Sequence, residues 1–176
     1  MLITARKMNE LSFSKLMQVY RQANREHGKE LAPEETEDRQ MQLAEEDFYS
    51  YLHDSFFTHP GAVYCIWGEG GTYVSALRLE PYEDGLLLEA LETAPEQRKR
   101  GYATLLMLSV LAWLERQGSV RVYSHVDKQN LASRRTHLGC GFHVYRDYAA
   151  FIDGSVNRRA DTWLYEKIFP DFENND

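Results

Sequence analysis

The chain contains one strand–turn–helix–strand unit, and this unit constrains the fold more than any other part of the sequence. Leu86–Thr93 has the composition of a strand, Gly101–Gln117 reads as an apolar helix, and Ser119–Val126 reads as a second strand. Two strands joined through a helix run parallel, with a right-handed connection. The sequence therefore predicts one parallel strand pair, whatever the rest of the sheet does.

The other segments predict a mostly antiparallel sheet in one domain spanning residues 1–176, a length that suits a single well-buried core. Gly68-Glu69-Gly70-Gly71 separates two strand-like runs and is a strong hairpin signal. The remaining expected elements are a strand at Leu2–Arg6, helices over Glu10–Arg25 and from Pro33 to about Leu52, strands at Ala62–Trp67 and Tyr73–Leu79, a helix over Asn130–Leu138, and strands at Phe142–Ile152 and Ala160–Phe169. The first helix is expected to end at His27-Gly28 and the chain to fray at Glu173–Asp176. We expect an α/β (α+β) fold of order β-α-α-β-β-β-α-β-α-β-β, with the sheet splayed at the parallel pair.

The turn before the central helix has the composition of an anion site. Arg98-Lys99-Arg100-Gly101-Tyr102-Ala103 places three cations and a glycine where that helix begins. Backbone N–H groups in a first helical turn have no intrahelical partner and carry partial positive charge. Glycine leaves room for a ligand to approach the backbone. The turn therefore predicts a cradle for a pyrophosphate or a ribose phosphate.

Charge and cysteine content exclude several classes of partner. The net charge of −7 argues against nucleic acid and is compatible with a cationic acceptor. Cys65 and Cys140 form neither a disulfide framework nor a zinc site, so we expect no metal. Cys140 lies between two glycines, and we interpret it as a small packing residue rather than a nucleophile. Without a signal peptide or an apolar run of about 20 residues, we expect a cytoplasmic protein with no membrane partner, as a monomer or a homodimer.

A second segment, Asn130 to Phe142, completes a recognisable pattern. The first motif is the turn [Gln/Arg]-x-x-Gly-x-[Gly/Ala], which is matched by Arg98, Gly101 and Ala103. The second motif is an asparagine after a strand, an aromatic residue seven positions later and a closing Gly-Phe pair, which are matched by Asn130, His137, Gly141 and Phe142. In these two motifs, and in its order of elements, the chain resembles the GNAT family of N-acetyltransferases.

The resemblance implies that acetyl-CoA binds where the sheet splays, between the strands around Leu86–Thr93 and Val120–Val126. It implies that backbone amides of Arg98, Lys99, Arg100, Gly101, Tyr102 and Ala103 hold the pyrophosphate. Leu91 and Thr93 would pair through their backbone with the pantetheine arm, and Asn130 and Ser133 would flank it from the other side. An opened strand edge can bind such an amide chain as an extra strand.

Two glutamates are candidates for the base that an amine acceptor needs, because an amine of ordinary pKa about 10.4 is protonated at neutral pH. Glu89 and Glu92 interrupt an otherwise apolar strand, where a charge is costly unless it is used or exposed. Being three apart, they face opposite sides of a regular strand, so at most one reaches the cleft unless a bulge intervenes. We favour Glu92, whose slot in the resembling family points toward the acceptor. Either carboxylate can equally be a solvated side chain at a strand edge.

His137 departs from the family pattern, which often has a tyrosine there to donate to the leaving thiolate. Histidine can serve as such a donor near neutral pH, or His137 can be a surface residue of a short helix. Tyr102, Tyr145 and Tyr148 are alternative donors. The resemblance implies an N-acetyltransferase that moves acetyl from acetyl-CoA to a primary amine of a small molecule or peptide by direct attack. The alternative is a non-catalytic acyl-CoA-binding or regulatory module on the same fold.

Overall fold

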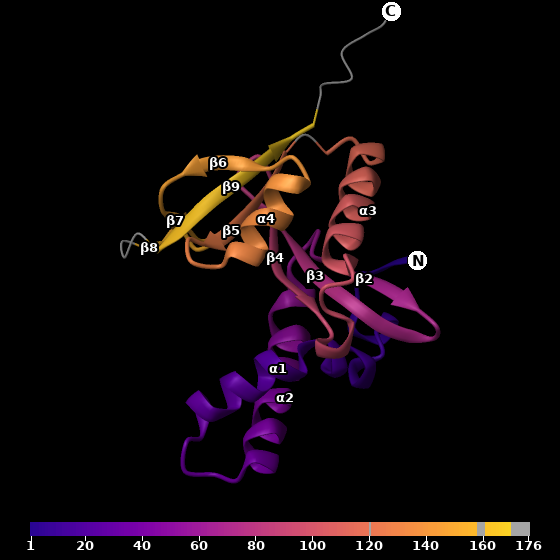
Figure 1. Ribbon diagram of the computed structural model, residues 1–176, viewed down its shortest axis with the longest axis vertical. Coiled ribbons are helices and arrows are strands. Elements are labelled where there is room, and N and C mark those ends of the chain that lie inside the picture. The colour runs from indigo at the N-terminus through magenta and orange to yellow at the C-terminus, as the bar shows by residue number, and fades with distance from the viewer. Residues whose placement is uncertain (120, 158–160, 170–176) are drawn as a thin grey trace, which may run out of the picture.

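A seven-stranded mixed sheet of order β1-β2-β3-β4-β5-β9-β6 runs through the molecule (Figure 1). The computed structural model describes residues 1–119, 121–157 and 161–169. Its strands are β1 (Leu2–Ala5), β2 (Val63–Glu69), β3 (Thr72–Tyr82), β4 (Gly85–Thr93), β5 (Arg121–Asp127), β6 (His143–Arg146), β7 (Ala149–Ala150), β8 (Val156–Asn157) and β9 (Thr162–Ile168). Its helices are α1 (Phe13–Leu31), α2 (Glu37–Asp54), α3 (Tyr102–Arg116) and α4 (Leu131–Gly139), with short 3-10 turns at Met8–Glu10, Phe56–Thr58 and Pro95–Gln97. The predicted order of elements and the mixed sheet are confirmed.

The parallel pair, β4 and β5, is joined over a short stretch of the described residues. Leu86, Leu87 and Leu88 pair with residues 122–124, and beyond that point the two strands part. β4 continues to Thr93 with its other edge on β3, and β5 continues to Asp127 with its other edge on β9. The predicted splay is therefore present, and it opens toward the carboxyl ends of both strands.

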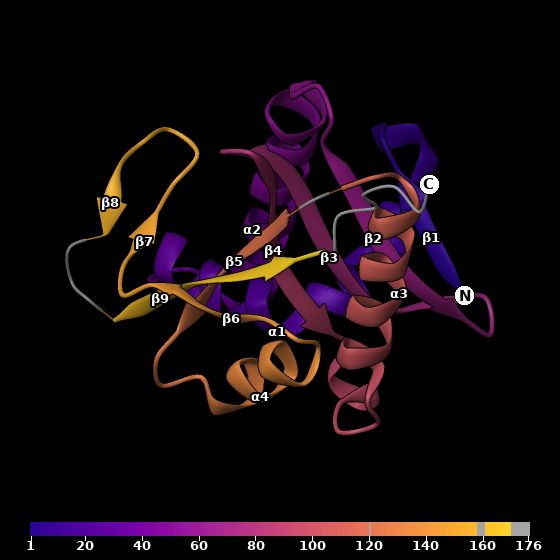
Figure 2. The same cartoon turned by 90° about the horizontal axis from the view of Figure 1, so that it is seen from above.

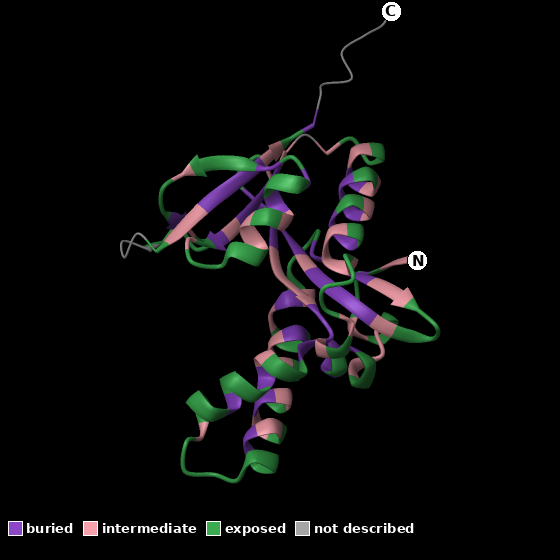
Figure 3. Ribbon diagram, viewed as in Figure 1, coloured by how far each residue is buried: buried purple, intermediate pink, exposed green. Residues whose placement is uncertain are grey.

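Two pairs of helices cover the two faces of the sheet. Successive strand residues point to opposite faces, so Cys65 packs in the cluster beneath α3 while Tyr64 packs in the cluster beneath α1 and α2. Seen from above, α3 and α4 lie together on one side of the strands (Figure 2). The far end of the α1–α2 hairpin extends beyond the sheet and is largely exposed (Figure 3). Among the described residues, no helix is both long and apolar enough to cross a bilayer.

Helix α1 differs from its prediction at both ends. It begins at Phe13 and continues through His27 and Gly28 to Leu31. A Cβ at Gly28 would lie 2.4 Å from the carbonyl oxygen of Gln40 on α2, so this glycine permits a close helix–helix contact instead of ending the helix. Helix α2 begins later than predicted, because Thr36 caps it by accepting a hydrogen bond from the backbone N–H of Arg39 at 3.4 Å.

The predicted strand Phe142–Ile152 is broken in two. β6 pairs with β9 in the main sheet, whereas β7 pairs with β8 in a separate hairpin. At the break, the Asp147 carboxylate accepts hydrogen bonds from Lys128 Nζ and Trp163 Nε1, both at 2.6 Å. These bonds hold the turn against β5 and β9. Val120, Ala160 and the predicted frayed end at Glu173–Asp176 lie outside the described residues.

Candidate active site

A bulge in β4 shapes the site. Between the pairs Ala76–Glu92 and Arg78–Glu89, β3 contributes one residue and β4 contributes two, Ala90 and Leu91. Ala90 takes a φ of +50°, which is uncommon for a residue with a side chain, and its carbonyl accepts a 2.6 Å hydrogen bond from Tyr20 Oη of α1. Strained backbone of this kind concentrates at functional sites.

The bulge also changes the direction of the two glutamates. Ala76 and Arg78 are two apart on β3 and share a face, and Glu92 and Glu89 lie directly opposite them. Both carboxylates therefore project on the face covered by α1 and α2, where Ala76 is packed. The expectation that a regular strand separates them fails because β4 is not regular.

Two cavities meet at the splay. The larger, of about 600 Å³, lies between β4, α1, the start of α3 and α4, and the smaller, of about 230 Å³, lies between the parting strands β4 and β5. Leu91 and Ser133 line both. The predicted residues in the larger cavity are Leu91, Glu92, Thr93, Arg98, Lys99, Gly101, Tyr102, Ala103, Asn130 and Ser133, and those in the smaller are Leu91, Glu89, Ser133 and His137.

The smaller cavity passes between the strands from one face of the sheet to the other. Ser124 and His125 are neighbours on β5 and so point to opposite faces, yet both line it. Ser124 contacts His137 on the α4 side, and His125 lies near Glu89 on the other side. A molecule seated against α3 and α4 can therefore meet, through this opening, a second molecule that approaches from the opposite face.

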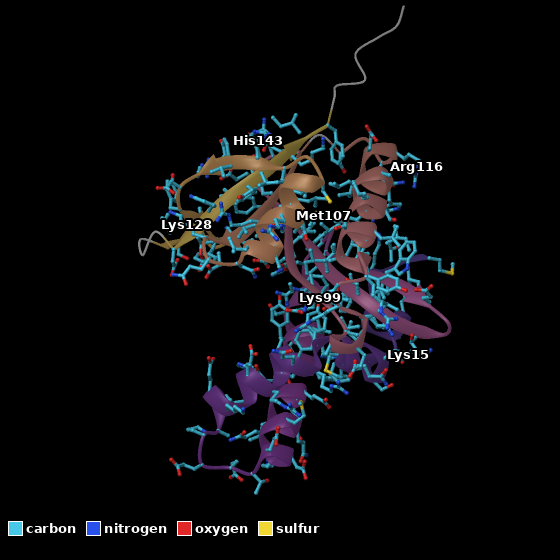
Figure 4. The ribbon with its side chains drawn as sticks, in the orientation of Figure 1. Lys15, Lys99, Met107, Arg116, Lys128 and His143 are labelled. Atoms are coloured by element: carbon cyan, nitrogen blue, oxygen red, sulfur yellow. The ribbon has the colours of Figure 1, made fainter. Side chains whose placement is uncertain are left out.

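The N-terminus of α3 has the geometry predicted for an anion cradle. Gly101 has a φ of +81° and offers no side chain to cap the helix, so the first-turn N–H groups receive no capping bond from it. No atom lies within 4 Å of where its Cβ would stand. Lys99 precedes it with a φ of +62° and lies at this end of α3 (Figure 4). The cradle opens directly into the larger cavity.

The three cations of the turn do different things. Arg98 turns inward: it contacts Glu92 Oε2 at 3.2 Å, donates to the Thr93 carbonyl at 3.2 Å and donates to a glutamine of α1 at 2.7 Å. Arg100 donates to Gln97 at 3.0 Å and is not among the residues lining either cavity. Lys99 lines the larger cavity and contacts no carboxylate among the ion pairs of the described residues. Arg98 instead fixes the end of β4 through its contacts with Glu92 and the Thr93 carbonyl.

The two glutamates differ in electrostatic environment. Burial raises the pKa of Glu92 above its ordinary value, although the adjacent Arg98 opposes the shift. Burial also acts to raise the pKa of Glu89, but the contact with His125 and the charge of Arg78 outweigh it, and the pKa is lowered. Glu89 Oε2 lies 3.6 Å from Arg78 Nη2. Both carboxylates are held by cations on the same face of the sheet.

His137 is buried, with only 2% of its surface exposed, which contradicts the reading as a surface histidine. Its Nδ1 lies 2.8 Å from the Ser133 carbonyl and 3.3 Å from the Ser133 hydroxyl, and its Nε2 lies 2.9 Å from Ser124 Oγ. Because a carbonyl only accepts, Nδ1 carries the proton and donates it there. Burial lowers the pKa of His137, which favours the neutral ring.

Other predicted residues have mainly structural contacts. Asn130 caps α4, its Oδ1 accepting from the Ser133 N–H at 3.0 Å while the residue lines the larger cavity. Tyr145 and Tyr148 are not among the residues lining either cavity, whereas Tyr102 lines the larger one.

Neither cysteine has the environment of a nucleophile. Cys65 and Cys140 are both buried and free. Burial raises the pKa of the Cys65 thiol to about 12 and also raises that of Cys140. Within the described residues, no group of three or more His, Cys, Asp and Glu side chains is placed to hold a metal ion.

Sequence reasoning missed two parts of the site. Gln22, Ala23 and Glu26 of α1 form one wall of the larger cavity, and nothing in their helical pattern distinguishes them. Ser124 and His125 line the smaller cavity. They are polar residues inside an apolar strand. Burying a polar group without a partner costs free energy, so the reasoning applied to Glu89 and Glu92 would also have pointed to them.

Comparisons with known proteins bear on the family and on the fold. The sequence model of the acetyltransferase (GNAT) family matches residues 18–142. Over 55 residues the chain is 38% identical to aminoglycoside N(6')-acetyltransferase type 1 of Serratia marcescens, a segment covering 31% of this chain and 38% of that protein. The match thus spans well under half of that relative.

Two solved structures share the fold along nearly their whole length. PaiA N-acetyltransferase from Thermoplasma acidophilum, in complex with coenzyme A, aligns with a TM-score of 0.63 and 16% identity over 96% of this chain and 99% of that one. The ribosomal-protein-S18-alanine N-acetyltransferase from Escherichia coli aligns with a TM-score of 0.58 and 16% identity over 94% and 92%.

Proposed function

This chain belongs to the acetyltransferase (GNAT) family, and from that premise we propose that it transfers an acetyl group from acetyl-CoA to a primary amine by direct attack. One observation carries the proposal. A single cavity of about 600 Å³ brings together the open N-terminus of α3, the unpaired part of β4 and the start of α4. These are an anion cradle, a strand edge and a capped helix end, which suit the pyrophosphate and amide arm of acetyl-CoA.

The donor substrate is held mainly by backbone groups. The first-turn N–H groups of α3, after Gly101, face the larger cavity and can bind the pyrophosphate directly, with Lys99 beside them. Leu91 and Thr93 lie on the part of β4 that has no β5 partner, so their backbone groups can pair with the pantetheine arm. Leu91 and Ser133, which line both cavities, mark where the thioester would lie.

Glu89 is the carboxylate best placed to take the proton from the acceptor. It lines the opening between β4 and β5, on the face opposite to α4, whereas Glu92 lines the donor cavity and is held by Arg98. The cavity geometry thus favours Glu89 over the sequence-based preference for Glu92. Once the amine is neutral it can attack the thioester carbonyl, and backbone N–H groups at the bulge would stabilise the oxyanion.

The leaving thiolate needs a proton or a hydrogen-bond donor. Ser133 lines both cavities, and the His137 ring lies within hydrogen-bond distance of Ser133 and of Ser124. We assign the donor role to this Ser133–His137 pair, in the place where many family members have tyrosine. With both thiols buried, no acyl-enzyme is expected, and initial-rate plots for the two substrates should intersect; parallel lines would contradict direct attack.

The names of the relatives and the charge of the site select the amines to be tested as acceptors. The Serratia marcescens relative is named for aminoglycosides and the Escherichia coli structure for an alanine of a ribosomal protein. Glu89 lines the smaller cavity, on the face from which the acceptor approaches, and its carboxylate favours a cationic amine there. Amino sugars and polyamines are therefore the first panel to test, followed by peptide N-termini.

Thiol release from acetyl-CoA across that panel tests the proposal. Turnover with an amine, reduced by about 10²–10⁴-fold in Glu89→Gln, is the expected result. Glu92→Gln tests the competing base, and Glu115→Gln, at the far end of α3, is a matched control. Binding of acetyl-CoA without turnover on any amine would instead favour a non-catalytic acyl-CoA-binding module.

A further inference from the structure

One backbone carbonyl of the β7–β8 hairpin receives two side-chain hydrogen bonds from the main sheet. The Ala150 carbonyl oxygen lies 2.9 Å from Tyr82 Oη of β3 and 2.8 Å from His125 Nε2 of β5. A carbonyl only accepts, so the tyrosine hydroxyl and the histidine Nε2–H both donate. The hairpin is thereby fixed to the sheet, and the protonated nitrogen of His125 is fixed with it.

The other ring nitrogen of His125 points at the candidate base. Nδ1 lies 3.8 Å from Glu89 Oε1, across the opening where β4 and β5 part. The ring is held in place by Phe151, whose centroid is 5.1 Å away, and by Tyr82 at 6.4 Å. Only 13% of the His125 side chain is exposed. The orientation of Nδ1 toward the carboxylate is therefore built into the fold.

The charged and titratable groups facing this pair come from two elements, β3 and α2. Arg78 of β3 lies 3.6 Å from Glu89, and Tyr51 of α2 lies under the Arg78 guanidinium at 4.7 Å from the ring centroid. Tyr82 of β3 faces the His125 ring, and its hydroxyl donates its hydrogen bond to the Ala150 carbonyl of the hairpin. The described ion pairs of Glu89 are with Arg78 and His125. Of these two side chains, His125 has a ring nitrogen that can accept a proton.

We propose that His125 is a positioning residue that receives, through Glu89, the proton lost by the acceptor amine. This inference rests on the proposed function. The ammonium group gives one proton to the Glu89 carboxylate, which passes it to Nδ1 and is ionised again. The neutral amine forms the C–N bond, the C–S bond breaks, and the second proton on nitrogen goes to the thiolate. The distance of 3.8 Å is longer than a hydrogen bond, and such contacts commonly tighten when substrate binds.

Two substitutions separate the proton-accepting role from the clamp on the hairpin. In His125→Gln the amide nitrogen can reach the position of Nε2 and keep the bond to Ala150, but nothing able to take a proton faces Glu89. In His125→Asn the amide can face Glu89, but the bond to Ala150 is lost. A role limited to holding the hairpin predicts near-normal activity for the glutamine variant and a defect for the asparagine variant.

We expect His125→Gln to lower kcat/KM about tenfold or more, less than loss of the base itself, while acetyl-CoA affinity and unfolding temperature stay near wild type. The acid limb of its pH–rate profile should shift, because the profile then reports protonation of Glu89 alone instead of protonation of the Glu89–His125 pair. His143→Gln is the matched control, since His143 of β6 lies 2.9 Å from Glu166 of β9, away from Lys99 and the cradle (Figure 4). Activity of His125→Gln within twofold of wild type, with an unmoved limb, would overturn the proposal.

A second readout does not depend on acetyl transfer. Ring ¹⁵N spectra of His125 report which nitrogen carries a proton, in the wild-type protein and in Glu89→Gln. We expect Nε2 to stay protonated and the Nδ1 signal to change when Glu89 is replaced. An unchanged Nδ1 signal shows that the two groups are not coupled and refutes the inference, even if the enzyme acetylates amines. Coupling in a protein that acetylates no amine would instead refute the proposed function alone.

Discussion

Replacing Gly101 with alanine tests the anion cradle, and the chain supplies a matched control at the other end of the same helix. Gly101 precedes α3 with a φ of +81° and Gly118 follows it with a φ of +75°. A Cβ added at either position would have no neighbouring atom within 4 Å. An alanine in this left-handed region costs roughly 1–2 kcal/mol at either site. The two variants should therefore be destabilised alike, by about 2–8 °C in Tm for a chain of this size.

Only the Gly101 variant should lose affinity for coenzyme A. Its methyl group would project into the cavity of about 600 Å³, where a phosphate must approach the first-turn N–H groups. Losing one hydrogen bond to a charged group costs about 1.5–3 kcal/mol, which corresponds to roughly 10- to 150-fold in Kd. Gly118 lies outside the residues that line the cavity, so its variant should bind normally.

Isothermal titration with coenzyme A and with pantetheine measures this difference. Pantetheine lacks the nucleotide and its phosphates, so both variants should bind it as the wild-type protein does. Equal coenzyme A affinity in Gly101→Ala and Gly118→Ala would refute the assignment of the cradle. A matching loss for pantetheine in the Gly101 variant would show that the effect is a general distortion of α3 rather than a blocked phosphate.

Three further outcomes follow from the packing and from the buried histidine. Gly28→Ala should destabilise the protein by about 1–3 kcal/mol, because its Cβ would lie 2.4 Å from the Gln40 oxygen, whereas Gly139→Ala in open space on α4 should gain about 0.5–1 kcal/mol in denaturant unfolding. His137→Phe should lower turnover with little change in acetyl-CoA affinity; unchanged turnover would remove this histidine from the mechanism. Because burial lowers the His137 pKa below its ordinary 6.5, the unfolded chain binds the proton first as pH falls through that value. Tm should therefore drop more between pH 7 and pH 5 in wild type than in His137→Phe, and equal drops would contradict the shift.

The sequence predicts the parallel pair and the basic turn before α3 well because both follow from local rules. A strand, a basic turn with Gly101 and an apolar helix each leave their own pattern, and the connection between parallel strands is then determined. The positions of Glu89 and Glu92 do not follow from such rules. They depend on where β4 takes up an extra residue against β3, and no residue type marks Ala90 as the site of a bulge.

Other failures of prediction have the same origin in contacts between distant segments. Gly28 reads as a helix end, yet its lack of a side chain is used to seat Gln40 of α2. The break after β6 depends on Asp147 meeting Lys128 and Trp163, which no local pattern reveals. His125 acquires its importance only when the hairpin carbonyl and Glu89 are brought to opposite sides of its ring.

The short pairing of β4 with β5 has a mechanical consequence. Among the residues that the structure describes, the two halves of the sheet share the pairs between Leu86–Leu88 and residues 122–124 and no others. A donor arm laid along the open edge of β4 would supply hydrogen bonds that the neighbouring strand does not make there. The loaded protein would then resist opening as a larger cooperative unit, and backbone amides of the flanking strands would exchange with solvent more slowly. In this sense the sheet of the free protein has room for one more strand, and a bound donor arm would fill that place.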